Sequence, residues 1–158
     1  MQNIQYRIIN APSGTLGDLL EAVASPEGKL WPAPAWPPLI LDAGLTPGSS
    51  GGHGPIRYRV TDHDPGRRVR FKFAPDLGLA GFHEFLIEDL GPTSCRVTHT
   101  IQGTLRGSMI LLWPLAIRWL HEALLQDLFD QAERLATGQV ARSARWSLWV
   151  RVLRSLRR

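Results

Sequence analysis

Residues 52–73 read GHGPIRYRVTDHDPGRRVRFKF, and apolar and charged residues alternate along most of this stretch. Its apolar positions are Ile56, Tyr58, Val60, Val69, Phe71 and Phe73. The positions between them are mostly cationic: Arg57, Arg59, Arg68, Arg70 and Lys72. A period of two is typical of a strand with one buried face. His63-Asp64-Pro65-Gly66 has the composition of a turn, so the stretch predicts an antiparallel hairpin with one apolar and one cationic face.

A second hairpin follows, with a turn at Gly91-Pro92. Its inward face is predicted to carry His83, Phe85 and Ile87 on one strand and Cys95, Val97, His99 and Ile101 on the other. Pairing Ile87 with Cys95 and Phe85 with Val97 would place His83 directly opposite His99. On the outward face we expect Glu84 and Glu88 to balance the cationic residues of the first hairpin.

Outside the hairpins, the sequence predicts a strand at residues 5–9, a helix at 15–23, a short strand at 39–45 and a flexible glycine–serine loop at 46–54. Prolines in residues 25–38 exclude regular structure, and we expect Trp31 and Trp36 to pin that stretch to the domain. Residues 113–136 predict a long helix ending at Gly138. The expected buried stripe of this helix is Ile117, Leu120, Leu124, Leu128 and Leu135. A sheet with one apolar face needs a cover, and this helix is the predicted cover.

This order of elements resembles the START-like (SRPBCC) superfamily of polyketide cyclase/dehydrase and lipid-transport proteins. The stretches that carry the likeness are residues 52–73, GLAGFHEFLIEDLG at 78–91, CRVTHTIQG at 95–103 and PLAIRWLHEALLQDLFDQAERL at 114–135. The resemblance implies an α+β helix-grip fold over residues 1–138, with a curved antiparallel sheet wrapped around the long C-terminal helix. It also implies a cavity for an apolar or amphipathic molecule, but no particular reaction, because members include carriers, cyclases, sensors and chaperone activators. The prolines of residues 24–38 depart from the usual helical pair.

The expected ligand cavity lies between the sheet and the long helix. Its predicted lining is Tyr58, Phe71, His83, Phe85, Val97, His99, Trp113, Ile117, His121 and Leu124. The histidines have three interpretations: structural hydrogen bonding, polar anchoring of a ligand, or acid/base and metal chemistry with His83 and His99 as the catalytic candidates. We expect no cofactor and no metal, and the single cysteine, Cys95, excludes a cysteine-based zinc site.

These features leave three functions open. The first is binding of a lipid- or polyketide-like small molecule in the cavity. The second is an enzyme of the cyclase/dehydrase type that uses the cavity histidines. The third is a non-catalytic interaction module recruited through its C-terminal tail.

The net charge of +4 is unevenly distributed along the chain. Residues 1–138 sum to −2, whereas residues 139–158 carry six arginines and no acidic residue. On a helix, these last residues would place tryptophans and aliphatic side chains on one face and arginines on the other, a pattern typical of interfacial helices. The tail could adsorb to an anionic membrane, pack on its own domain, or contact a second subunit in a homodimer. Nucleic acid is the least favoured partner. The predicted contact residues are Arg145, Trp146, Trp149, Arg151, Leu153 and Arg154.

The predicted location is the cytoplasm, with attachment to the inner membrane surface as the alternative. The first residues, MQNIQYRIINAP, lack the layout of a signal peptide. The longest apolar run, residues 109–120, is interrupted by Pro114 and Arg118. It is also shorter than the roughly 20 residues that span a bilayer.

Overall fold

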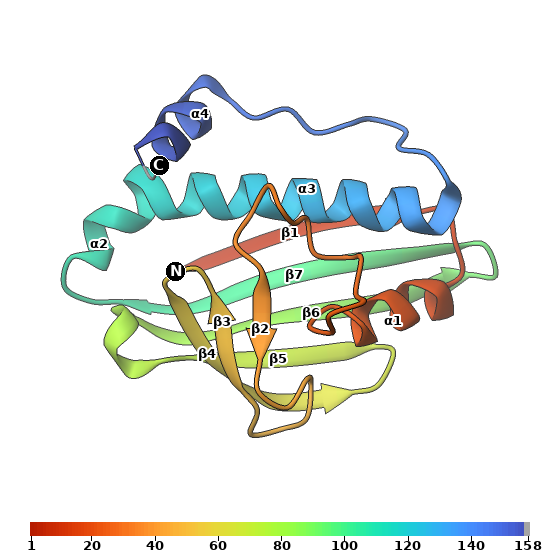
Figure 1. The fold of residues 1–158 in the computed structure, drawn as a ribbon, viewed down its shortest axis with the longest axis horizontal. Coiled ribbons are helices and arrows are strands. Elements are labelled where there is room, and N and C mark those ends of the chain that lie inside the picture. Colours follow the sequence, from red (N-terminus) through yellow and green to blue (C-terminus); the bar gives the residue numbers. More distant parts are fainter. Residues whose placement is uncertain (157–158) are drawn as a thin grey trace.

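The computed structural model describes residues 1–156 and shows an α+β fold with a curved seven-stranded antiparallel sheet (Figure 1). The strands are β1 Gln2–Ile9, β2 Leu39–Leu41, β3 Ser50–His53, β4 Ile56–Asp64, β5 Arg68–Phe73, β6 Leu79–Gly91 and β7 Ser94–Leu105. Their order across the sheet is β1-β7-β6-β5-β4-β3-β2. Only the β1–β7 neighbours join strands distant in sequence, so the sheet is mostly built from consecutive hairpins.

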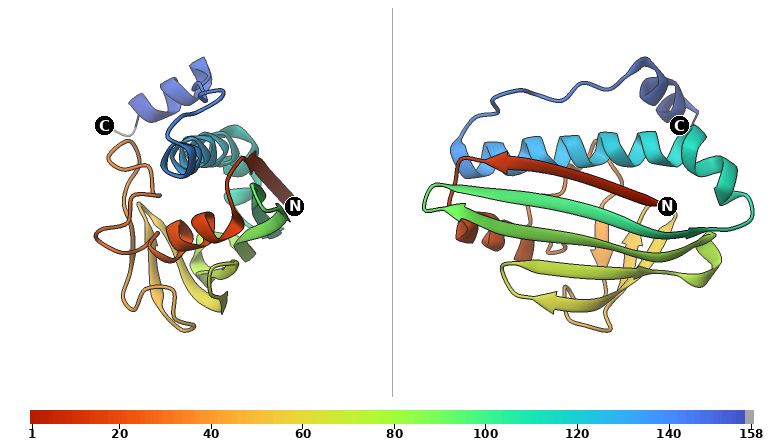
Figure 2. Two further views of the ribbon diagram at one scale, coloured as in Figure 1. Left: turned by 90° about the vertical axis from the view of Figure 1, so that its right-hand side faces the viewer. Right: turned by 180° about the vertical axis from the view of Figure 1, so that it is seen from behind.

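The helices cover the inner face and one end of this sheet. They are α1 Ser13–Glu21, η1 Pro75–Leu77, α2 Met109–Leu112, the π-helical turn η2 Trp113–Ile117, α3 Arg118–Thr137 and α4 Leu148–Ser155. The α2, η2 and α3 segments follow one another without a break and form the long helix that the sheet curves around (Figure 2). No helix within residues 1–156 is long and apolar enough to cross a membrane.

The first hairpin forms where the alternating pattern predicts it. Tyr58, Val60, Val69 and Phe71 are buried in the core, while the cationic positions between them lie on the outer face. On that face Arg70 pairs with Glu84 at 2.7 Å, as expected. Glu88 instead pairs with Arg96 of β7, at 3.5 Å.

The second hairpin has a different register from the expected one. Ile87 lies opposite Val97, Phe85 opposite His99, and His83 opposite Ile101. The prediction that His83 lies directly opposite His99 is therefore wrong. The shift is two residues, which keeps every apolar side chain on the inner face, so the alternating pattern alone could not detect it.

The predicted flexible loop at residues 46–54 is also wrong, because four of these residues form strand β3 between β2 and β4. Its glycines are required by close packing. A Cβ at Gly51 would lie 2.0 Å from the carbonyl oxygen of Ile40, and one at Gly52 would lie 1.8 Å from that of Ile56. Because two central positions of β3 have no room for a Cβ, this strand has the glycine-rich composition of a loop.

The long helix begins earlier than predicted, at Met109, and ends at Thr137. Leu120, Leu124 and Leu128 are buried along it, and Gly138 ends it in a left-handed conformation with φ of 82°. Trp31 and Trp36 do pin the irregular proline-rich stretch. The Trp31 indole donates to the carbonyl oxygen of Pro37, and the Trp36 indole donates to Asp127 of α3.

The chain after α3 returns along that helix as an irregular arch and then forms α4 (Figure 1). Ser147 caps the N-terminus of α4, because its hydroxyl accepts a hydrogen bond from the Val150 amide at 3.2 Å. Residues 139–147 are not helical, which differs from a helix over the whole tail. Arg157 and Arg158 lie outside the described residues.

Candidate functional site

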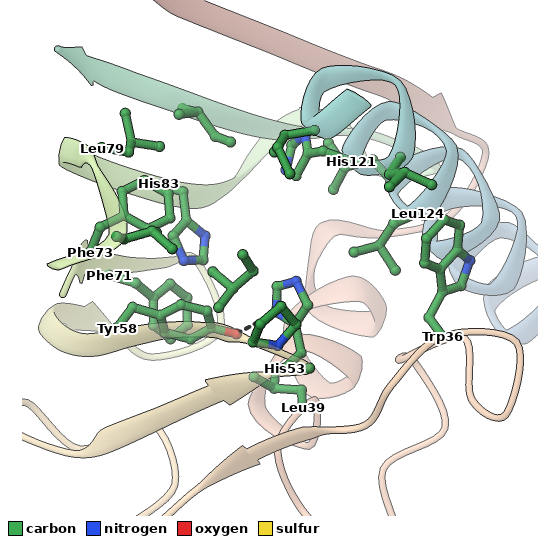
Figure 3. Close-up of a pocket in the computed structure, with 18 of the residues that line it drawn as sticks. Trp36, Leu39, His53, Tyr58, Phe71, Phe73, Leu79, His83, His121 and Leu124 are labelled. Atoms are coloured by element: carbon green, nitrogen blue, oxygen red, sulfur yellow. Dashed lines mark hydrogen bonds between the residues drawn. The ribbon is translucent and has the colours of Figure 1, made fainter. Parts of the chain in front are cut away.

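A cavity of about 100 Å³ lies between the inner face of the sheet and the long helix. Figure 3 shows side chains from both layers converging on it: Tyr58, Phe71 and His83 from the strands, and His121 and Leu124 from α3. Its lining is almost entirely apolar and aromatic, and none of the described residues that form it is acidic. The cavity is smaller than the roughly 300–1,000 Å³ that drug-sized ligands occupy.

Three histidines form a continuous row in the wall. The Nδ1 atom of His83 and the Nε2 atom of His99 are hydrogen bonded at 3.2 Å. The rings of His99 and His121 lie 4.9 Å apart between centroids, which brings the helix histidine against the sheet pair. His83 also stacks on Phe71 and Phe73, at 4.7 and 5.0 Å between centroids. The row therefore consists of polar rings held in an aromatic environment.

Burial keeps these histidines uncharged. Loss of solvation lowers the pKa of His83 and of His99 well below the ordinary value of 6.5, and neighbouring histidines lower it further. The same effect lowers the pKa of His121 to about 3. All three imidazoles are neutral at pH 7, so each carries one N–H donor and one bare nitrogen acceptor.

The hydrogen bond between His83 and His99 constrains what the pair offers a ligand. Within residues 1–156, the outer nitrogens of the pair, His83 Nε2 and His99 Nδ1, are buried and have no hydrogen-bond partner, and neither has His121 Nδ1. If His83 Nδ1 donates to His99, then His83 Nε2 is a bare acceptor and His99 Nδ1 carries a proton. The reverse tautomers exchange these roles. The pair therefore always has one unused donor and one unused acceptor.

A fourth histidine approaches from strand β3. The Nδ1 atom of His53 lies 3.0 Å from the phenolic oxygen of Tyr58, the contact drawn in Figure 3. Burial raises the pKa of Tyr58, so its hydroxyl is protonated and can donate to this imidazole. The Tyr58 ring in turn packs edge-on against His83, with 4.6 Å between centroids. This contact connects the sheet edge to the histidine row.

The structure brings nearly all of the predicted lining together. The predicted residues that line the cavity are Tyr58, Phe71, His83, Phe85, His99, Trp113, Ile117, His121 and Leu124. Val97 is buried in the core but is not among the lining residues. It lies opposite Ile87 of β6, whereas the expected register placed it opposite Phe85, which does line the cavity.

Several lining residues were missed by the sequence prediction: Trp31, Trp36, Leu39, His53, Phe73, Leu79 and Met109. For Phe73 and Leu79 the signal was present, because they continue the alternation of their strands. His53 had no such signal, since it follows glycines in a stretch that resembles a loop. Only the pairing of β3 with β4 brings it to the cavity.

The proline-rich stretch and the tail meet beside the cavity wall. One oxygen of Asp127, Oδ2, accepts hydrogen bonds from both the Trp36 indole at 2.7 Å and the Trp146 indole at 2.9 Å. The guanidinium of Arg154 lies over both rings, 4.3 Å from the Trp36 centroid and 4.2 Å from that of Trp146. Because Trp36 lines the cavity, the tail fixes one of its wall residues.

The predicted tail contacts therefore divide into two groups. Trp146, Leu153 and Arg154 face the domain, where they pack with Val150 against α3 and Trp36. Arg145, Trp149 and Arg151 are exposed. Arg154 was expected on the solvent-facing side of the tail helix, and this is wrong. It faces the domain, where the Trp36 and Trp146 rings compensate the burial of its charge. Among residues 1–156, no cluster of three or more His, Cys, Asp or Glu side chains is arranged to hold a metal ion.

No protein-family model matches the chain, and no curated protein matches it significantly. Solved structures do resemble it. A solution NMR structure of a protein from Thermobifida fusca has a TM-score of 0.65 and 15% identity, over 90% of this chain and 99% of that one. Norcoclaurine synthase from Thalictrum flavum, in complex with dopamine and hydroxybenzaldehyde, has a TM-score of 0.64 and 12% identity, over 90% of each chain. A protein from Chromobacterium violaceum has a TM-score of 0.57 and 15% identity, over 85% of this chain and 96% of that one. At these identities the likeness establishes a shared helix-grip fold.

Proposed function

We propose that the protein reversibly binds a small, single-ring compound carrying one hydroxyl group in the cavity between the sheet and the long helix. The observation that carries this proposal is the row of buried neutral histidines with unused hydrogen-bonding nitrogens in an otherwise apolar wall. Ligand pockets commonly combine an apolar lining with a few polar groups that orient the ligand.

The size of the cavity supports a small ligand. A dry apolar cavity of about 150 Å³ accommodates benzene, and the cavity here is about 100 Å³. A single ring is therefore close to the upper limit without movement of the walls. A long lipid chain or a fused polyketide would require the long helix or the proline-rich stretch to move.

The histidine pair supports a hydroxyl group. A hydroxyl can either donate or accept a hydrogen bond, so it can bond to the unused nitrogen of His83 or to that of His99, whichever it reaches, in either tautomer. Satisfying a buried polar group recovers about 1–3 kcal/mol that would otherwise be lost. The phenolic compound bound by the norcoclaurine synthase structure is consistent with a ligand of this class on the same fold.

The test compares phenol with toluene, which has nearly the same shape but no hydroxyl. Calorimetric titration of the full chain should show tighter binding of phenol. The double substitution His83→Leu/His99→Leu should abolish that preference, while Leu124→Phe, which fills the cavity, should weaken both ligands. Equal affinity of the wild-type protein for phenol and toluene would contradict the role of the histidines. Unchanged binding in the Leu124→Phe variant would contradict the cavity as the site.

A cyclase/dehydrase-type reaction is the second candidate. Its support is the hydrogen-bonded pair itself. One outer nitrogen can take up a proton, the shared proton can move across the hydrogen bond, and the other outer nitrogen can then release a proton, which leaves both rings in the opposite tautomer. We place it second because the low pKa of both imidazoles makes them weak general bases at neutral pH. In this hypothesis His83→Leu and His99→Leu would each remove turnover while ligand binding remained measurable.

A further inference from the structure

An exposed apolar surface covers the end of the molecule where α2 and η2 meet α4. Both views of the ribbon place α4 beside the start of the long helix (Figures 1 and 2). The indole of Trp149 donates a hydrogen bond to the carbonyl oxygen of Leu115 at 2.8 Å, so the two segments are in contact. We call this region the apolar end surface. Its exposed members are Ile110, Leu111, Leu112, Leu115, Leu148, Trp149, Val152 and Leu156.

These side chains contribute little to the core. Leu111 is 67% exposed and Leu148 is 78% exposed, whereas Met109, Trp113 and Val150 supply the buried contacts of the same segments. Single exposed hydrophobic residues are ordinary, but a contiguous group of them marks an interaction surface. The two helical segments therefore have two apolar sides, of which one packs on the domain and the other faces solvent.

The charged residues of the segments that form this surface are all positive. The sequence has no acidic residue from 90 to 121 or from 134 to 158. Arg145 and Arg151 are exposed and form no ion pair with any residue in 1–156. Trp119 and Trp149, both partly exposed, hydrogen bond to the backbone carbonyls of Pro114 and Leu115. Indoles at the rim of an apolar surface, together with unpaired arginines, are typical of proteins that lie in a membrane interface.

We propose that the apolar end surface docks the protein on a bilayer containing anionic lipid, with the leucines in the acyl region and the arginines at the headgroups. A second copy of the chain fits this surface poorly. A symmetric contact would place the apolar end surfaces of two copies, and with them the arginines of both, in one interface, and the segments that form the surface contain no carboxylate to pair with those arginines. An anionic headgroup supplies that compensation.

The surface also backs directly onto the cavity. Met109, Trp113 and Ile117 line the cavity from the inner side of the same segment that presents Leu111 and Leu115 outward. Docking would therefore bring one cavity wall to the boundary of the acyl region. This proposal does not depend on the ligand, because the surface is formed by outward-facing residues.

The experiment is flotation of the full chain with vesicles of phosphatidylcholine, with or without phosphatidylglycerol. The wild-type protein should float with the phosphatidylglycerol vesicles and lose this binding in high salt. The double substitutions Leu111→Ser/Leu115→Ser and Leu148→Ser/Val152→Ser should each weaken binding roughly tenfold or more.

Matched controls place the same changes elsewhere. Ile40→Ser/Leu90→Ser removes two exposed apolar side chains outside the surface and should leave binding unchanged. Arg151→Gln should weaken binding roughly fivefold, whereas Arg59→Gln, on the outer face of the sheet, should not. Circular dichroism should show that each variant retains the wild-type fold, since every changed side chain is exposed.

Two results would overturn the proposal. The first is wild-type binding by the Leu111→Ser/Leu115→Ser variant, which would remove α2 and η2 from the interface. The second is a wild-type protein that sediments as a dimer and binds no vesicles, while the same variant sediments as a monomer. That result would assign the surface to a second copy.

Discussion

Acidification from about pH 7 to about pH 5 should destabilise this protein through its buried histidines. His121 has a folded-state pKa of about 3 against an ordinary value of 6.5. Between these two values the unfolded chain binds a proton that the folded chain does not. Protonation therefore favours the unfolded state, and stability falls as the pH drops through 6.5 toward the folded-state pKa.

The magnitude follows from the two pKa values. The slope is about 1.4 kcal/mol per pH unit for one histidine, and integrating it gives a loss of about 2 kcal/mol from His121 between pH 7 and pH 5. Burial lowers the pKa of His83 and His99 as well, so both add to this loss in the same direction. Typical domains have only about 5–15 kcal/mol of stability, so the loss from His121 alone is already a substantial share of it.

Urea unfolding followed by tryptophan fluorescence measures this effect at a series of pH values. The buried histidines should change the free energy of unfolding little above about pH 7, and below that pH it should fall steeply. His121→Leu should reduce the acid slope by one proton, and the m-value should stay constant. If His121→Leu has the same acid slope as the wild-type protein, the folded state already accommodates a charged imidazole and the reasoning is wrong.

Three further predictions concern the packing that holds the cavity. Arg7→Met should lower the free energy of unfolding by about 3 kcal/mol, because Arg7 pairs with the buried Asp130 at 2.5 Å. A loss near zero in urea unfolding would show that water already compensates that carboxylate. Gly17→Ala should cost about 1–3 kcal/mol, since its Cβ would lie 2.5 Å from a carbonyl oxygen of the β4–β5 turn. The control Gly14→Ala meets no atom within 4 Å and should be neutral or stabilising, and equal effects of the two would argue against the close approach. Asp127→Ala should lower the free energy of unfolding by about 2 kcal/mol and raise the rate at which phenol enters the cavity, because two indole N–H groups lose their acceptor. Asp127→Asn should retain more of the wild-type stability and entry rate. Identical entry rates in the wild-type protein and both variants would refute the role of the tail in holding the cavity wall.

The sequence was informative wherever local chemistry repeats. The two hairpins, the long helix and its end at Gly138 follow from alternation, periodicity and a residue suited to positive φ. Nine of the ten predicted lining residues reach the cavity for the same reason, since an inward position on a strand or helix is set by local geometry. The alternation also placed His83 and His99 on one face, although it could not fix which residues lie opposite one another.

Local sequence patterns therefore indicate which residues face inward and which element covers the sheet. Packing of the whole chain sets which of those residues touch. A register shift of two residues preserves the inward face, so only the packed sheet brings His83 Nδ1 to His99 Nε2. Likewise, Arg154 faces the domain because two indoles from distant segments pack against its guanidinium. His53 reaches the cavity because neighbouring glycines leave room for the backbone of adjacent strands. Contacts between residues far apart in the chain depend on packing, and no local period encodes them.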